Sequence, residues 1–132
     1  MNNNLSYNEL IERAKKEYSA ACLLLENDYL GGSVNRAYYA MFYAARAALL
    51  IAGAPVNLEE IRTHQGLVGA FGNHIVNKKL VSVEIGRYLK RTLKARMISD
   101  YAEYHTTSDN AKIIVEQAGK FITAIQAKFE NK

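Results

Sequence analysis

The chain has 132 residues, a formal net charge of +4 at pH 7 and an apolar fraction of 49%, a balance that argues against disorder and favours one globular domain over residues 1–132. One cysteine and three histidines exclude an internal disulfide and make a structural zinc site unexpected. The sequence shows no long apolar run and no basic-then-apolar start, so we expect a cytoplasmic protein without membrane contact.

The first part of the chain predicts two long helices. Ser6 followed by Glu9 is a capping-box pattern, and apolar residues then recur at helical spacing, so we expect a helix over residues 6–27. The Gly31-Gly32 pair predicts a break. A second helix is then expected over residues 33–53, capped by its first residue, a serine.

The second predicted helix is rich in alanine but carries a line of polar and aromatic side chains. At about 100° per residue, one side of the helix brings together four such residues. They are Arg36, Tyr39, Tyr43 and Arg46. Because a buried guanidinium or phenol costs roughly 1 to 3 kcal/mol when unpaired, this line must bind another subunit, a ligand or the rest of the core. A ligand would make Arg36 and Arg46 nucleotide or RNA contacts.

The second part of the chain predicts a short helical region and two further long helices. A capping-box pattern at residues 57–60 predicts a helical turn, and residues 63–76 predict a short helix whose evenly spaced glycines let another helix approach closely. Ser82 starts a long helix with Met97 among its inner positions, and residues 106–109 stop it and cap the last helix. The sequence thus predicts an all-α fold, an antiparallel up-and-down bundle of four long helices plus a short helical segment.

Positive charge is concentrated between residues 78 and 96, where seven basic residues and one acidic residue give a local charge of +6. Four of the basic residues share one helix face and are candidate phosphate contacts. They are Arg87, Lys90, Arg91 and Lys94. A solvated helix face explains the same pattern, and both interpretations stay open.

The residues best suited to catalysis follow this basic segment. Arg96 can stabilise charge on a phosphate and His105 can transfer a proton, with Asp100 and Tyr101 to orient them, which would suffice for metal-free RNA cleavage. In a continuous helix His105 would lie about 13.5 Å along the axis from Arg96. The two converge only if the helix ends before the histidine or if a second subunit supplies one of them.

The other two histidines are interpreted as structural. His64 begins a helix and is more often a cap or a packed residue than a functional one, and His74 is expected at the surface. The chain has no phosphate-cradling loop, no nucleophile elbow and no metal-binding motif. We therefore expect no metal and no cofactor.

Three segments in this order resemble the HEPN domain family (higher eukaryotes and prokaryotes nucleotide-binding), in its small stand-alone prokaryotic branch. They are Arg36-Ala37-Tyr38-Tyr39-Ala40-Met41-Phe42 with Ala44-Ala45-Arg46-Ala47, then Thr63-His64-Gln65-Gly66-Leu67 with Phe71, then Arg96 with Asp100-Tyr101. The resemblance covers nearly the whole chain. It implies an antiparallel helical bundle, usually a homodimer, often encoded beside a small nucleotidyltransferase as a toxin and antitoxin pair.

The resemblance also implies roles for residues near Arg96. Active family members are metal-independent endoribonucleases that carry an arginine, four to six further residues and then a histidine. Arg96 matches the arginine, but eight residues separate it from His105. In some family pairs the nucleotidyltransferase adenylylates a tyrosine beside this motif, and Tyr101 or Tyr104 would be the matching acceptor.

Three functional hypotheses follow. The favoured one is a nucleotide- or RNA-binding component of a toxin–antitoxin pair with a nucleotidyltransferase. The alternatives are a metal-independent endoribonuclease toxin that uses Arg96 and His105, and a non-catalytic dimeric interaction module. The spacing of the motif argues against strong catalysis, so whether the protein is an enzyme is left open.

Overall fold

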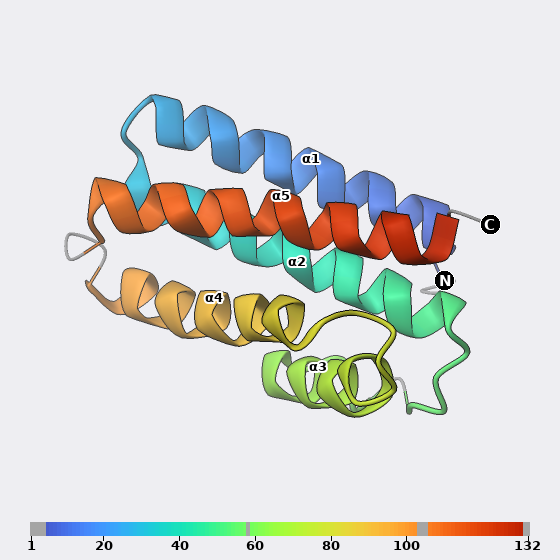
Figure 1. Ribbon diagram of the computed structural model, residues 1–132. Helices are drawn as coiled ribbons and strands as arrows, with labels where there is room; N and C mark the ends of the chain where they lie inside the picture. The colour runs from blue at the N-terminus through green and yellow to red at the C-terminus, as the bar shows by residue number, and fades with distance from the viewer. Residues whose placement is uncertain (1–4, 58, 103–105, 131–132) are drawn as a thin grey trace.

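The computed structural model describes residues 5–57, 59–102 and 106–130, with the side chains of residues 98–102 outside this description. Its elements follow one another in a simple order (Figure 1). They are α1 (Tyr7–Glu26), α2 (Leu30–Ile51), α3 (His64–Phe71), the π-helical turn η1 (Gly72–Val76), α4 (Val83–Ala102) and α5 (Ser108–Glu130). The predicted all-α bundle of four long helices plus a short helical segment is confirmed.

The start of α1 follows the predicted capping box. The Glu9 amide donates to Ser6 Oγ at 3.1 Å, and the Ser6 amide donates to the Glu9 carboxylate at 2.9 Å. Two of the amides that a helix N-terminus leaves without a backbone partner are therefore satisfied by side chains.

The predicted break at Gly31-Gly32 is wrong, because α2 already begins at Leu30 and includes both glycines in its first turn. The chain turns earlier, at Asp28, whose φ of 63° lies in the left-handed region that Asp tolerates better than most residues. Ser33 consequently does not cap the helix. It is buried, and its hydroxyl donates to the Leu30 carbonyl oxygen at 2.7 Å.

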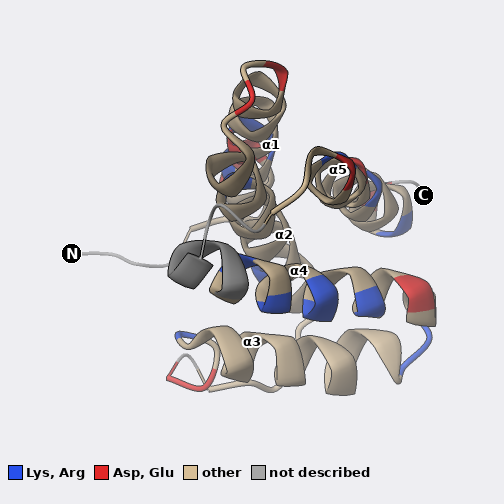
Figure 2. Cartoon of the chain, turned by 90° about the vertical axis from the view of Figure 1, so that its left-hand side faces the viewer, with Lys and Arg blue, Asp and Glu red and all other residues tan. Residues whose placement is uncertain are grey.

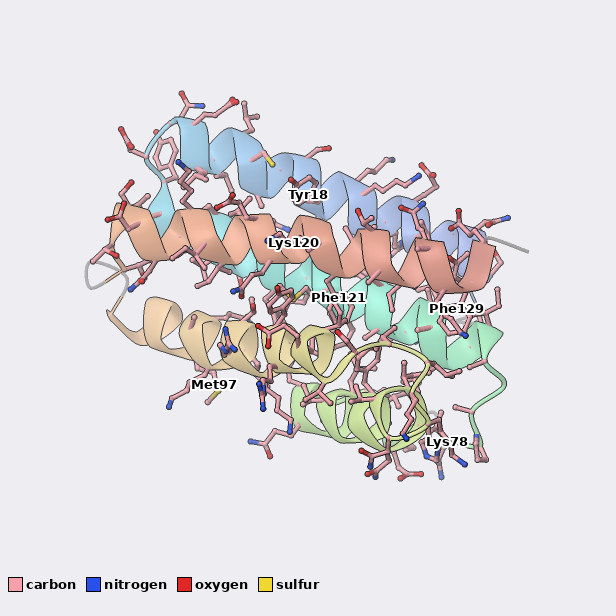
Figure 3. The ribbon with its side chains drawn as sticks, viewed as in Figure 1. Tyr18, Lys78, Met97, Lys120, Phe121 and Phe129 are labelled. Atoms are coloured by element: carbon pink, nitrogen blue, oxygen red, sulfur yellow. The ribbon has the colours of Figure 1, made fainter. Side chains whose placement is uncertain are left out.

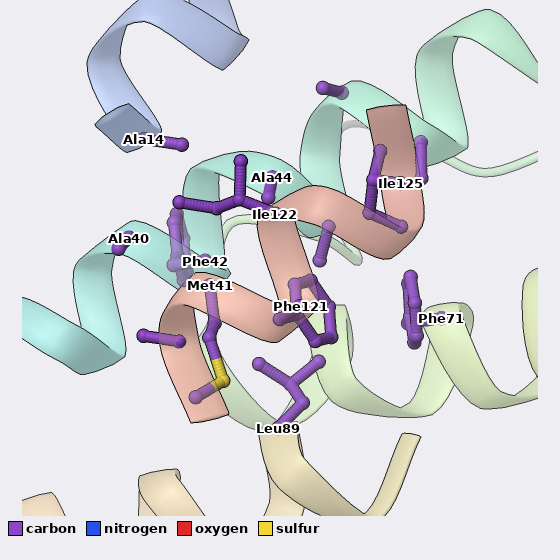
Figure 4. Close-up of a cluster of buried hydrophobic side chains, with 14 of the residues drawn as sticks. Ala14, Ala40, Met41, Phe42, Ala44, Phe71, Leu89, Phe121, Ile122 and Ile125 are labelled. Carbon is purple, nitrogen blue, oxygen red and sulfur yellow. The ribbon is translucent and has the colours of Figure 1, made fainter. Parts of the chain in front are cut away.

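Helix α2 is the centre of the bundle and contacts α1, α3, α4 and α5. Six of its alanines are completely buried, which lets neighbouring backbones come close on several sides. They are Ala37, Ala40, Ala44, Ala45, Ala47 and Ala48. Helix α2 also contributes large core side chains, among them Tyr38 and Met41, and the surrounding helices supply the others. Phe121 of α5 packs on Phe71 of α3 with ring centroids 5.2 Å apart, beside Leu89 of α4 (Figure 4).

Helices α3 and α4 lie side by side and run across the direction of the other helices (Figure 2). The spacing predicted Met97 as an inner residue of α4, and in this arrangement that prediction is wrong. Its side chain points away from the bundle and is 56% exposed (Figure 3). The reason is that α4 crosses α2 obliquely, so only part of its length stays against the core.

The segment between α2 and α4 is partly as predicted. Residues 59–62 form a turn, the Glu59 amide donates to Asn57 Oδ1 at 2.8 Å and the Asn57 amide donates to the Glu60 carboxylate at 3.2 Å, so the predicted capping pattern is present. The glycines do not receive another helix. A Cβ at Gly66 would collide with the Glu60 carbonyl oxygen in the preceding loop, whereas a Cβ at Gly69 would meet nothing within 4 Å. The close approach is thus made by loop backbone at one glycine.

Candidate functional site

Arg96 reaches from α4 to one face of α2. Its Nε donates to Asn35 Oδ1 at 2.8 Å, and its Nη2 donates to the Tyr39 hydroxyl at 3.3 Å. The guanidinium carbon lies 5.5 Å from the ring centroid of Tyr38 and 5.3 Å from that of Tyr39, within the range of a cation–π interaction. Asn35, Tyr38 and Tyr39 share a helix face because they are three and four residues apart. Hydrogen bonds and aromatic rings thus fix the position of this cation.

Tyr38 joins this face to α3. Its hydroxyl lies 2.7 Å from Nδ1 of His64, and the tyrosine side chain is completely buried. Burial raises the pKa of the Tyr38 phenol, with a smaller contribution from Tyr39 and an opposing one from Arg96. Tyr38 is therefore protonated at neutral pH and can donate its hydrogen to the imidazole.

His64 is held in place by the start of its own helix. Thr63 is the N-cap of α3, and its Oγ1 accepts a hydrogen bond from the Gly66 amide at 2.9 Å. The imidazole packs edge-on against Phe42, with centroids 5.6 Å apart, and also against Tyr38 at 5.1 Å. A capped helix start and an aromatic cluster therefore orient a half-buried imidazole.

Arg96 and His64 open onto the same pocket, which has a volume of about 420 Å³. Its lining residues come from the start of α3 and from the second half of α4. They are Thr63, His64, Gln65, Leu93, Arg96 and Met97. A guanidinium and an imidazole on one pocket suit an anion, and the planar guanidinium in particular suits a phosphate or carboxylate.

The predicted basic face lies on α4, on the N-terminal side of Arg96 (Figure 2). Arg87, Lys90, Arg91 and Lys94 are all exposed. Arg87 and Arg91 both pair with Glu84, at 3.6 and 3.7 Å, so part of their charge is compensated. Neither Lys90 nor Lys94 forms an ion pair with another residue that the structure describes.

The arginines of α2 are not brought to the pocket. Arg36 pairs with Glu17 of α1 at 3.1 Å, and its side chain is 47% exposed. Of the partners expected for this polar line, Arg36 thus has one within the chain, near the surface. A step of one residue turns the helix by about 100°, so Arg36 faces α1 whereas Asn35 faces α4. Arg46 lies over the Phe42 ring at 6.0 Å and does not line the pocket either.

Most of the predicted partners of Arg96 cannot be placed beside it. The backbone of Asp100 and Tyr101 forms part of α4, but the structure does not describe their side chains. Tyr104 and His105 lie outside the described residues altogether. The catalytic set with His105 and the adenylylation of Tyr101 or Tyr104 stay predictions.

Sequence reasoning did not identify Asn35 and Tyr38 as site residues and gave His64 mainly a structural role. The signal for Asn35 was present: an amide side chain in an apolar helix, four residues before Tyr39 and hence on the same face. No local signal joined Tyr38 to His64, because they are 26 residues apart. His74, expected at the surface, is half-buried in η1.

Comparison with known proteins identifies the family. The sequence model of the HEPN domain matches residues 7–128. The chain belongs to the HEPN domain family. Among relatives of this HEPN protein, a UPF0332 protein of Gloeobacter violaceus is 34% identical over 116 residues, which span 86% of this chain and 88% of the relative. A UPF0332 protein of Thermotoga maritima is 33% identical over 120 residues, or 90% of this chain and 87% of the relative.

A third relative has a functional name. A protein of Methanocaldococcus jannaschii named "Putative toxin" is 34% identical over 117 residues, which span 89% of this chain and 84% of the relative. Sequences that similar over most of both chains share their fold, so these relatives are also HEPN-type proteins.

Two observations on the HEPN chain concern membranes and metals. Within the described ranges, no helix is long and apolar enough to cross a membrane. Within the same ranges, His, Cys, Asp and Glu side chains form no group of three that could hold a metal ion.

Proposed function

We propose that this HEPN protein is the nucleotide- or RNA-binding component of a toxin–antitoxin pair whose other member is a nucleotidyltransferase. The family and the name of the Methanocaldococcus relative support the toxin context. The pocket supports the ligand class, because it offers cationic and hydrogen-bonding groups suited to phosphate.

The observation that carries this proposal is the placement of Arg96. Asn35 and Tyr39 each accept a hydrogen bond from its guanidinium, and the group also borders an open pocket. An arginine that is already oriented loses less side-chain entropy when it binds a phosphate than a freely moving one. The exposed Lys90 and Lys94 on the same helix extend the positive surface away from the pocket.

Binding of a fluorescein-labelled single-stranded RNA, followed by fluorescence anisotropy, tests the ligand class. Each phosphate contact contributes a slope of about −0.7 to a log–log plot of affinity against salt concentration. The paired change Lys90→Gln with Lys94→Gln should make that slope shallower. Arg96→Ala should weaken binding by more than the loss of one surface charge explains.

The matched control changes two lysines on other helices. Lys16 of α1 and Lys120 of α5 are exposed, so Lys16→Gln with Lys120→Gln alters the net charge equally. This control should keep the affinity and slope of the unchanged protein. Equal losses of affinity in both double variants would show that RNA binding depends only on net charge. The absence of any binding would reject the proposal. Cleavage of the RNA in excess chelator would instead favour the endoribonuclease alternative.

The toxin role is tested by expression in a bacterial host. Induction should arrest growth, Arg96→Ala should relieve the arrest, and co-expression of a nucleotidyltransferase encoded beside this chain should relieve it as well. Unimpaired growth at a verified protein level would count against the toxin role while leaving RNA binding to the anisotropy test.

We also propose a homodimer. Met97 and Val83 expose large apolar side chains along α4, at 56% and 58%, and a specific interface of at least about 1,000 Å² would cover them. Sedimentation equilibrium at micromolar concentration should give twice the chain mass of 14.8 kDa. A single species of 14.8 kDa would rule the dimer out.

A further inference from the structure

The hydrogen bond between Tyr38 and His64 determines where the imidazole carries its proton. The Tyr38 hydroxyl is buried and lies 2.7 Å from His64 Nδ1, and among the described residues it has no other hydrogen-bond partner. If Nδ1 of a neutral imidazole donated to the phenol oxygen, the phenol hydrogen would be left without an acceptor. An unsatisfied buried donor is strongly unfavourable.

The phenol therefore donates to Nδ1, and a neutral His64 carries its hydrogen on Nε2. Nε2 of the neutral imidazole is thereby left as the donor. The raised pKa of Tyr38 extends this behaviour to alkaline pH, because the phenol keeps its proton.

We infer that His64 donates a hydrogen bond through Nε2 to a phosphate group that Arg96 binds in the shared pocket, with Tyr38 as the positioning residue that fixes the imidazole tautomer. This inference rests on the proposed function and deepens it, since it names the group that the pocket recognises and a second residue that contacts it. Arg96 and His64 both pack on the ring of Tyr38 and both line the pocket, so one phosphate can meet both side chains.

The hydrogen on Nε2 also determines whether His64 can act as a general base. A general base must offer an unprotonated nitrogen to the substrate, and Nε2 is protonated as long as Tyr38 keeps its own proton. His64 consequently stabilises the negative charge of a phosphate and does not remove a proton from a ribose hydroxyl.

Two substitutions at position 64 divide the functions of the imidazole. In His64→Asn, the amide oxygen can still accept from Tyr38, but the donor on the side of Nε2 is lost. In His64→Gln, the longer side chain can place its amide nitrogen near the former Nε2. We expect the affinity for inorganic phosphate to fall about fivefold or more in the Asn variant, and to fall less in the Gln variant. Tyr38→Phe should weaken phosphate binding about two- to tenfold, because the imidazole of His64 can then adopt either tautomer.

The deciding measurement is long-range proton–nitrogen NMR on protein with ¹⁵N-labelled histidine. His64→Gln assigns the signal, and His74→Gln is the matched control at a histidine outside the pocket. The unchanged protein should show His64 with its hydrogen on Nε2, and inorganic phosphate should shift that resonance and not the His74 one. In Tyr38→Phe, a mixture of tautomers should appear.

A hydrogen on Nδ1, or an Nε2 resonance that does not respond to phosphate, would overturn the inference. If the labelled RNA still binds in that case, the proposed function stands without it. If neither RNA nor phosphate binds, the proposed function fails and the inference fails with it.

Discussion

Arg96 and Asn35 are separated by 61 residues in the sequence, and their side chains are joined by a hydrogen bond of 2.8 Å between Nε and Oδ1. The bond connects α4 to α2 at the edge of the pocket. Because the amide oxygen accepts from Nε, it sets the orientation of the whole guanidinium plane and thereby the direction in which the terminal nitrogens point.

Asn35→Ala should therefore weaken RNA binding while leaving the fold intact. Arg96 would keep its hydrogen bond with Tyr39 but lose the one with Asn35. Hydrogen bonds to charged groups contribute about 1.5 to 3 kcal/mol. We expect a loss of affinity in the anisotropy assay with a small change in the thermal midpoint. An unchanged affinity would show that Tyr39 and the tyrosine rings suffice to orient Arg96.

Two glycines of α3 should respond in opposite directions to the same substitution. Gly69→Ala should stabilise the protein by up to about 1 kcal/mol, because a Cβ there meets open space and alanine favours helix. Gly66→Ala should destabilise it by about 1 to 3 kcal/mol, because the Cβ would collide with the Glu60 carbonyl oxygen. Denaturant unfolding of both variants measures the difference, and a shift in the same direction would contradict the packing of the loop.

Arg36→Ala should change the free energy of unfolding by less than about 1 kcal/mol, as is usual for an ion pair near the surface. The pair with Glu17 is the interaction lost. A double-mutant cycle with Glu17→Ala isolates its contribution. A coupling energy of several kcal/mol would show that the pair is much less accessible to solvent than its geometry indicates.

Stability should fall in alkaline solution, and Tyr38 should account for part of the fall. The pKa of its phenol is raised from the ordinary value of 10.0, so above that pH the unfolded chain loses a proton that the folded chain keeps. Stability is then complete below pH 10.0 and decreases as the pH rises toward the folded pKa.

Tyr38→Phe should reduce the slope of stability against pH in this range by about 1.4 kcal/mol per pH unit. Urea titrations from neutral pH to about pH 12 measure it. The lost hydrogen bond to His64 lowers stability by a similar amount at each pH, so the comparison depends on the slope alone. An identical slope in both proteins would contradict the raised pKa.

Much of the fold could be predicted because its signals are local. Ser6 with Glu9 marks the start of α1, and the spacing of apolar residues marks the inner face of α5, where Phe121 and Ile125 are buried. The start of α2 was missed because glycine is a common turn residue, whereas this turn uses the left-handed conformation of Asp28.

The candidate site was less predictable because it depends on which face of each helix meets another. Arg36 and Asn35 are adjacent in the sequence, and only the packing of α2 between α1 and α4 decides which of them meets Arg96. The pairing of Tyr38 with His64 likewise depends on the path of the loop before α3, which no periodic pattern specifies.

The alanines of α2 also restrict how the sequence can change. Their methyl groups are completely enclosed by the neighbouring helices, so a longer side chain would push backbones apart on whichever side it pointed. In a library with every amino acid at every position, Ala40, Ala44 and Ala48 should accept little beyond glycine and serine, while exposed positions of α1 and α5 vary freely. New specificities in this protein would therefore have to be selected at the rim of the pocket, on α3 and α4, around an inner helix that stays nearly constant.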